Sequence, residues 1–445
     1  MGGRRGRRLP ADPIVMNIER LSHEGRGIAH HDDRTAFVQG ALPGEQAQVQ
    51  VRRRRRRQDE GQAIAIEHPA ADRVTPPCPH VGVCGGCSLQ HMDPAAQVRH
   101  KQDTLADQFR HIGEVSPQRW LPALTGPTAG YRRRARLGVK YVPRKDDRVL
   151  VGFRERFSPF VADIDHCHVL DARVADRLGE LAQLIRSLSI PHRIAQIEVA
   201  AGDTEVGLVF RNLEALSTSD REALIAFGHT HGLMMFEQPG NESSVAPLGH
   251  AQTRIEYALS DLGLRFAFAP TDFTQVNAAM NAQMVPQALD LLDLQPEHRV
   301  LDLFCGLGNF TLPIAQRAGQ VIGVEGAEAL VERGRENAAL NQINNAEFFA
   351  ADLTQAHPDA AWLGGQIDRV LLDPPRSGAL EVLPAIAKLA PERIVYVSCG
   401  PATLARDAGA LVHQHGYTLE AAGLMDMFPH TAHAEAMALF TRTRR

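Results

Sequence analysis

The 445-residue sequence lacks any apolar run long enough to cross a membrane and has only two tryptophans. A membrane-spanning helix needs about 20 consecutive apolar residues, so a membrane protein is not expected. The basic N-terminal segment MGGRRGRRLPAD is not followed by the apolar region of a secretory signal. We therefore expect a cytoplasmic protein that does not act at a membrane.

Cysteine is also scarce, with six residues in the whole chain. In a reducing compartment such cysteines are more naturally ligands or nucleophiles than a disulfide framework. Cys78, Cys84 and Cys87 lie within ten residues of one another, and Cys167 is a distant fourth. Four thiolates suit a structural zinc ion or an iron–sulfur cluster. The spacing fits neither the paired CxxC pattern of zinc proteins nor the CxxxCxxC pattern of radical enzymes, so both metals stay open on the residues alone.

Positive charge is concentrated in a chain whose net charge is −4. Residues 52–57 are six consecutive arginines, and residues 131–156 hold ten Lys or Arg against three acidic residues. A third basic stretch lies at residues 4–8. One charged run usually marks only a solvated surface, but three of them favour a nucleic-acid partner.

The length predicts about three domains, so we expect a multidomain α/β protein. After a basic tail at residues 1–11, residues 12–70 alternate β-prone runs with turns, which predicts a five-stranded barrel of the oligonucleotide-binding (OB) kind. The motifs Gly25-x-Gly27-x-Ala29 and Pro43-Gly44-Glu45 resemble those of a TRAM domain. That resemblance implies a barrel that binds RNA.

Residues 71–268 form the second predicted unit, a mixed β-rich domain. The three clustered cysteines lie at its start in a Pro/Gly-rich stretch, residues 69–92, which we name the cysteine loop. A helix is expected over residues 94–112, as a candidate to pack on the last domain. Short strands follow, with one helix near residues 172–187.

Residues 269–445 alternate strands and helices, which predicts a doubly wound, Rossmann-like parallel sheet. The expected strands cover residues 299–304, 320–325, 346–350, 368–373 and 394–398, with a helix at 327–341. Residues 417–428 and 436–441 are expected to form an antiparallel pair at the sheet edge.

A nucleotide cofactor is predicted at the carboxyl edge of this sheet. Gly306 and Gly308 follow the first strand and let the backbone approach a ligand at the start of a helix. Glu325 ends the second strand, where a carboxylate can bind ribose hydroxyls, and Asp352 follows the third, at the position that meets an adenine edge. The third glycine of a dinucleotide fingerprint is replaced by Thr311, and an Asp-Pro-Pro motif starts at Asp373. S-adenosylmethionine is therefore preferred over NAD.

Two further residues suggest the chemistry. Cys399 follows an apolar strand directly before Gly400-Pro401, and Glu435 lies in the run HTAHAE. A thiolate that adds to uracil C6 activates C5 for methylation, and a base must then remove the C5 proton. We assign Cys399 as the nucleophile and Glu435 as the base.

Across almost the whole chain, this arrangement resembles the RNA uracil-5-methyltransferase family, and most closely its TRAM-containing, iron–sulfur branch that acts on 23S ribosomal RNA. The resemblance implies the same roles for Cys399 and Glu435. It implies cofactor contacts by Gln275, Phe304, Asn309, Glu325, Asp352 and Asp373. It also implies a [4Fe–4S] cluster on Cys78, Cys84, Cys87 and Cys167, with zinc as the alternative. One position departs from the family, which usually has Asn where this sequence has Gly400.

The expected partner is 23S ribosomal RNA, and no obligate protein partner is implied. One alternative is a uracil-5-methyltransferase that acts on transfer RNA, which would normally lack both the barrel and the cluster. Another alternative is a non-catalytic RNA-binding factor in ribosome assembly. Such a factor would be a methyltransferase scaffold that has lost its activity. The presence of Cys399, Glu435 and the cofactor residues argues against this alternative.

Overall fold

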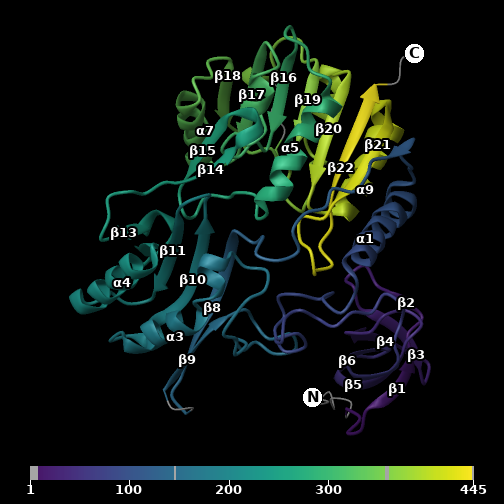
Figure 1. The fold of residues 1–445 in the computed structure, drawn as a ribbon. Coiled ribbons are helices and arrows are strands. Elements are labelled where there is room, and N and C mark those ends of the chain that lie inside the picture. The colour runs from purple at the N-terminus through teal and green to yellow at the C-terminus, as the bar shows by residue number, and fades with distance from the viewer. Residues whose placement is uncertain (1–8, 145–146, 356–359, 443–445) are drawn as a thin grey trace, which may run out of the picture.

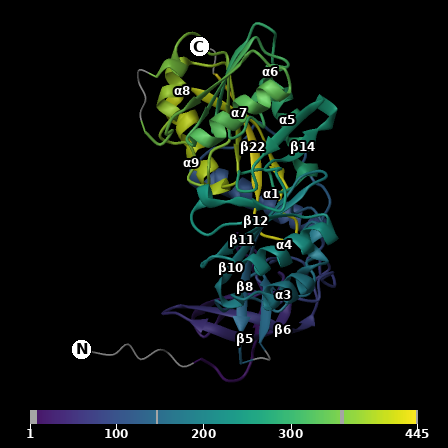
Figure 2. The ribbon, with the colours of Figure 1, turned by 90° about the vertical axis from the view of Figure 1, so that its left-hand side faces the viewer.

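The computed structural model describes residues 9–144, 147–355 and 360–442, which form three large sheets with their covering helices and one two-stranded sheet (Figure 1). In the view of Figure 1 and in the view turned by 90° (Figure 2), the C-terminal sheet lies at one end of the molecule. The N-terminal and central sheets lie toward the other end. The predicted tail arginines, Arg4, Arg5, Arg7 and Arg8, lie outside the described residues, as do Lys145 and Asp146. No helix in the described part is long and apolar enough to cross a membrane.

The N-terminal sheet has six strands in the order β1-β5-β6-β4-β3-β2. The prediction of five strands was wrong, because the two residues of β2 pair with Gly27 and Ile28 of β3. A side chain at Gly27 would place a Cβ 2.8 Å from Ile18 Cγ2, so the close packing of the sheet requires glycine there. The strands are β1 (Ile14–Asn17), β2 (Arg20–Leu21), β3 (Gly27–His31), β4 (Arg34–Gln39), β5 (Gln46–Arg54) and β6 (Gln58–His68).

Gly25 lies in the turn between β2 and β3, with a φ of +71° that favours glycine. It also contacts two distant segments. An added Cβ would lie 2.7 Å from Leu89 Cδ2 in the cysteine loop and 3.3 Å from Ala432 Cβ near the C-terminus. The N-terminal sheet therefore packs directly on both segments.

The central sheet has the order β13-β12-β11-β10-β8-β9, and only β11 and β12 pair in parallel. The single helix predicted near residues 172–187 is wrong, because Asp176 caps α2 and Arg177 leaves helical geometry before α3 begins. The elements are β8 (Arg134–Val142), β9 (Arg148–Gly152), α2 (Ala172–Ala175), α3 (Leu178–Ser187), η2 (Pro191–Arg193), β10 (Ile194–Ala201), β11 (Val206–Asn212), α4 (Thr218–His231), β12 (Met234–Glu237), η3 (Glu242–Ser244) and β13 (Ala246–Leu248).

A hairpin of β14 (Ile255–Leu259) and β15 (Leu264–Phe268), joined by η4 (Ser260–Leu262), leads to the C-terminal sheet. The order of that sheet is β18-β17-β16-β19-β20-β22-β21-β7, with β18 through β20 parallel. Its elements are α5 (Ala278–Leu292), β16 (Arg299–Leu303), α6 (Thr311–Ala315), β17 (Gln320–Glu325), α7 (Glu328–Leu340), β18 (Ala346–Ala350), η5 (Ala361–Leu363), β19 (Arg369–Leu372), α8 (Leu383–Leu389), β20 (Arg393–Ser398), α9 (Pro401–His415), β21 (Tyr417–Met425) and β22 (Glu435–Arg442).

The edge of this sheet differs from the prediction. β22 and β21 are antiparallel as expected, but β7 (Arg119–Trp120) pairs in parallel with β21 and forms the edge strand. Buried apolar side chains from both faces of the strands form two cores, one under α5 and the other under α8 and α9. A strand buried on both faces is expected for a sheet covered by helices on each side.

Helix α1 (Pro94–Gln108) joins the cysteine loop to this second core. Asp93 caps it by accepting hydrogen bonds from the amides of Ala95 and Ala96. The α-helical turns end at Gln108, and Phe109–Gly113 continue as one π-helical turn. The helix lies beside α9 and β21 (Figure 1). Its Lys101, 1% exposed, donates to Asp426 Oδ1 at 2.6 Å and to Phe428 O at 3.0 Å.

We expect either Lys101→Met or Asp426→Leu alone to destabilise the protein by about 3–5 kcal/mol, because each leaves a buried charge without its partner. The double variant should melt closer to the wild type, since it removes both charges. Scanning calorimetry of the three variants measures this. A double variant as unstable as the sum of the two single variants would contradict the pairing.

Candidate active site

All eight residues predicted for cofactor and catalysis line one cavity of about 580 Å³ at the carboxyl edge of the C-terminal sheet. The parallel strands all point their carboxyl ends at this edge, so loops that are far apart in sequence meet there. The volume is within the ordinary range for a small-molecule site. The eight residues are Gln275, Phe304, Asn309, Glu325, Asp352, Asp373, Cys399 and Glu435.

The turn after β16 has an unusual backbone. Phe304 adopts a φ of +64°, which a bulky residue rarely does, and Gly306 and Gly308 have φ values of +55° and +95°. Strained conformations of this kind persist where the surrounding structure enforces them, as it often does at ligand sites. Here the amides of Phe304 and Cys305 both donate to the carbonyl of Val324 in the next strand.

Two carboxylates border the cavity beyond this turn. Glu325 accepts hydrogen bonds from the amides of Gly306 at 3.1 Å and Gly326 at 2.8 Å. Asp352 accepts from the hydroxyl of Thr354 at 2.6 Å and from the side-chain amide of Gln355 at 2.7 Å. These bonds fix both carboxylates at the border of the cavity.

Asn309 is held by residues that the sequence did not indicate. Its Oδ1 accepts from the hydroxyl of Tyr257 at 2.8 Å and from Nδ2 of Asn281 at 2.9 Å. Its own Nδ2 donates back to Asn281 Oδ1 at 2.9 Å. Tyr257 belongs to the hairpin β14–β15, so this strand pair forms one wall of the cavity.

Cys399 and Glu435 are brought together by one strand pair. β20 ends at Ser398 and β22 begins at Glu435, and Ser398 pairs with Ala436 in antiparallel register. The residue after β20 therefore lies beside the first residue of β22. Glu435 is 7% exposed, whereas Cys399 is only partly buried and faces the cavity.

Burial dominates the electrostatics of this pair. It raises the pKa of Glu435 to about 8, and the nearby Asp373 raises it further while Arg376 lowers it. Burial also raises the pKa of Cys399 to about 11, with Glu435 and Asp373 adding to the effect and Arg376 opposing it. The pKa of Asp373 is raised to about 7 by burial and by the charge of Glu325. Perturbed groups clustered in one cavity are typical of a catalytic site.

The glycine at position 400 has a steric explanation. A Cβ on Gly400 would lie 2.7 Å from Thr403 Oγ1 and 3.1 Å from the carbonyl oxygen of Arg376. Thr403 also donates to the carbonyl of Arg376 at 3.0 Å. The loop after Cys399 is thus closed tightly against the Asp-Pro-Pro-Arg segment, and this contact leaves little room for a side chain.

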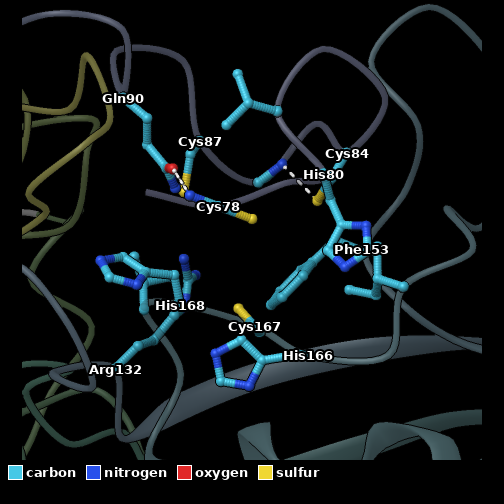
Figure 3. A pocket seen from close by; sticks show the side chains of 14 residues that line it. Cys78, His80, Cys84, Cys87, Gln90, Arg132, Phe153, His166, Cys167 and His168 are labelled. Atoms are coloured by element: carbon cyan, nitrogen blue, oxygen red, sulfur yellow. Dashed lines mark hydrogen bonds between the residues drawn. The ribbon is translucent and has the colours of Figure 1, made fainter. Parts of the chain in front are cut away.

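A second cavity, beside the central sheet, is lined by Cys78, Cys84, Cys87 and Cys167 (Figure 3). Gln90 accepts a hydrogen bond from the amide of Cys78 at 3.1 Å and so fixes the start of the loop. Burial raises the pKa of Cys87 to about 12, and the neighbouring thiolates of Cys167, Cys84 and Cys78 raise it further. Within the described ranges, no group of three or more His, Cys, Asp or Glu side chains is arranged to hold a metal ion.

Sequence reasoning missed two cations near the catalytic pair. Arg376 lines the cavity directly after the Asp-Pro-Pro motif, a position that could have indicated it. The sequence indicates the position of Lys101 less clearly, because a lysine on a helix ordinarily points to solvent. It shares a helix face with Gln97 and Leu105 at four-residue spacing, and all three are buried.

Comparison with known proteins agrees with this geometry. Residues 95–443 match the tRNA (Uracil-5-)-methyltransferase family, and residues 16–64 match the TRAM domain. Proteins named 23S rRNA (uracil(1939)-C(5))-methyltransferase RlmD from Alkalilimnicola ehrlichii and Alcanivorax borkumensis are 61% and 51% identical to this chain. Each alignment covers 99% of both chains.

A similar fold occurs in Pyrococcus abyssi tRNA (uracil-54, C5)-methyltransferase, crystallised with S-adenosyl-L-homocysteine. The TM-score is 0.72 at 23% identity, with 96% of this chain and 100% of that chain covered. The chain therefore belongs to the tRNA (uracil-5-)-methyltransferase family, and it carries an N-terminal TRAM domain.

Proposed function

We propose that this enzyme methylates C5 of one uridine in 23S ribosomal RNA, with S-adenosylmethionine as the methyl donor. The observation that carries the proposal is the single cavity that joins Cys399 and Glu435 to six candidate cofactor residues. The full-length relatives named for 23S rRNA support the choice of RNA. Such a substrate places the enzyme in the cytoplasm.

The cofactor site fits the proposed donor by its chemistry. We propose that Glu325 binds the ribose hydroxyls and that Asp352 binds the adenine edge, because both carboxylates line the cavity. Gln275, Phe304, Asn309 and Asp373, which also line it, complete the proposed cofactor contacts. S-adenosylmethionine supplies an electrophilic methyl group there.

The proposed reaction uses two residues in sequence. The Cys399 thiolate bonds to uracil C6, and the electrons of the C5=C6 bond move onto C5 and O4, so that C5 can take the methyl group of S-adenosylmethionine, which would be released as S-adenosylhomocysteine. Glu435 then accepts the C5 proton, the C5=C6 bond forms again and the bond from Cys399 to C6 breaks. Since both reacting carbons lie within a base stack, the uridine must be flipped into the cavity.

We further propose that Cys78, Cys84, Cys87 and Cys167 hold a [4Fe–4S] cluster. A zinc ion needs its four sulfurs about 2.3 Å from one point. Zinc is the alternative, because four cysteines suit either group. An iron–sulfur cluster binds each sulfur at a separate iron, so it suits thiols that surround a cavity, as these do (Figure 3). Its proposed role is to tie the loop at 78–87 to the central domain.

We propose three domains: an RNA-binding domain at residues 12–70, a central domain at 71–268 and a methyltransferase domain at 269–445. The proposed RNA-binding surface belongs to the first domain and includes its arginine run, residues 52–57. The six arginines of the run are not equivalent. Arg54 bonds Asp59, and Arg53 and Arg55 pair with Glu60. Arg52 and Arg57 are exposed at its two ends.

Methyl transfer to 23S RNA tests the proposed chemistry directly. With labelled S-adenosylmethionine, the wild type should place label at uracil C5, and Cys399→Ala should place none. Glu435→Gln should trap a methylated covalent adduct, because the proton cannot be removed. Label in transfer RNA but not in 23S RNA would show that the enzyme is a transfer RNA uracil-5-methyltransferase. Tight RNA binding without transfer to either RNA would favour the non-catalytic alternative.

The pH dependence tests the role of Arg376. Its charge lowers the pKa of both Cys399 and Glu435, which must each lose a proton to act. Arg376→Gln should therefore shift the rise of the single-turnover rate to higher pH and slow the reaction at pH 7. Arg317→Gln, which removes an exposed partner of Asp290, is the control and should leave the profile in place. An unshifted profile for Arg376→Gln would rule out this effect.

Salt dependence tests the arginine run. Replacing Arg52 and Arg57 by Gln should weaken RNA binding and reduce the slope of log K against log salt by about 2, if each contacts one phosphate. Filter binding at several salt concentrations measures both quantities. Arg99→Gln, an exposed arginine paired with Asp72, is the control. Equal slopes for the double variant and the wild type would exclude phosphate contacts there.

A further inference from the structure

The segment that leads to Glu435 is held mainly by side chains from outside its own sheet. Residues 426–434, which we name the base loop, connect β21 to β22. Lys101 of α1 bonds Asp426 and the carbonyl of Phe428. The hydroxyl of Tyr131 donates to the carbonyl of Pro429 at 2.9 Å.

His430 is the most constrained residue of the base loop. Its φ of +66° is a left-handed conformation that is uncommon for residues other than glycine. The amides of Ser88 and Leu89, in the cysteine loop, both donate to its carbonyl at 2.9 Å. Its own amide donates to Oε1 of Gln97 at 2.8 Å. The backbone of His430 is therefore held at both its donor and its acceptor.

Gln97 is the centre of these contacts. It is 1% exposed, so its amide has no access to water. Its Nε2 donates to Met92 O at 2.8 Å and Leu89 O at 3.1 Å, and lies 3.3 Å from Nδ1 of His430. A buried amide that is fully bonded on both sides fixes its partners strongly, because any displacement leaves polar atoms unsatisfied. Gln97 thus joins α1, the cysteine loop and the base loop at one point.

From these contacts we propose that Gln97 is a positioning residue for the base Glu435, an inference that rests on the proposed function. Gln97 fixes His430, and Ser88 Oγ accepts from the amide of Ala432 at 3.0 Å, two residues further along. Glu435 starts β22 only three residues after Ala432. The direction of the carboxylate at C5 is therefore set by the anchored base loop.

This arrangement predicts a selective defect. Cys399 follows β20, and the candidate cofactor residues follow β16 to β19 or precede α5, so the bonds of Gln97 do not reach them. Loss of Gln97 should leave thiolate addition and methyl transfer intact and slow only proton removal. The enzyme would then accumulate on RNA as the methylated covalent adduct. A general loss of folding would reduce every step together.

The test measures first-turnover methyl transfer and the fraction of enzyme in a denaturation-resistant, methylated RNA adduct. Gln97→Ala should keep first-turnover transfer near the wild-type rate and slow adduct release on the order of tenfold or more, since small misplacements of a catalytic group cost that much. Ser88→Ala should show a smaller effect in the same direction. It removes one hydroxyl from a partly exposed position and keeps the test open if Gln97→Ala folds poorly.

Two comparisons make the result decisive. Asn212→Ala deletes another buried amide, one that bonds Gln238 N and Glu214 O in the central domain, and should not accumulate adduct. Glu435→Gln is the reference for a blocked base. If it traps adduct while Gln97→Ala and Ser88→Ala release product as the wild type does, the positioning role is wrong and the proposed function stands. If Glu435→Gln traps none, the proposed function itself fails, and this inference with it.

Discussion

The antiparallel insertion of β22 beside β20 is the constraint on which the site depends. In a parallel sheet, strands end at the carboxyl edge and their successors start at the opposite edge. β22 reverses that direction, so its first residue lies where β20 ends. Cys399, the proposed nucleophile after β20, and Glu435, the proposed base at the start of β22, therefore line the same cavity. No loop has to fold back over the sheet to bring them together.

Burial of Cys399 and Glu435 also raises their pKa values and so disfavours the deprotonated forms that the proposed reaction needs. Glu435, Asp373 and Cys399 each have a raised pKa because they share a poorly solvated cavity and carry charges of one sign. Arg376 and Lys101 are the nearby cations that oppose this effect at Glu435. Arg376 also opposes the effect at Cys399, so this one arginine favours deprotonation of both proposed catalytic residues.

Much of the C-terminal sheet could be predicted because strand pattern and site chemistry coincide. The apolar runs predicted β16 to β20 within about one residue, and the two runs that end in an acidic residue put Glu325 and Asp373 at the correct edge. The two residues of β7 were not predictable, since such a short strand exists only through its pairing with β21. The burial of Gln97 and Lys101 was not predictable either, because it follows from tertiary packing that opposes their intrinsic preference for water. The roles of the cavity residues remain predictions.

The close packing of Gly25 fixes the position of the N-terminal sheet relative to the C-terminal cavity. Its turn touches Leu89 and Ala432 so closely that no side chain fits between them. The N-terminal sheet therefore packs against the base loop and is not joined to the rest of the protein by a flexible linker alone. Under the proposal that residues 12–70 bind RNA, the bound nucleotides would lie at a fixed separation from Cys399. That separation, set when the protein folds, would then limit which uridine can reach the thiol.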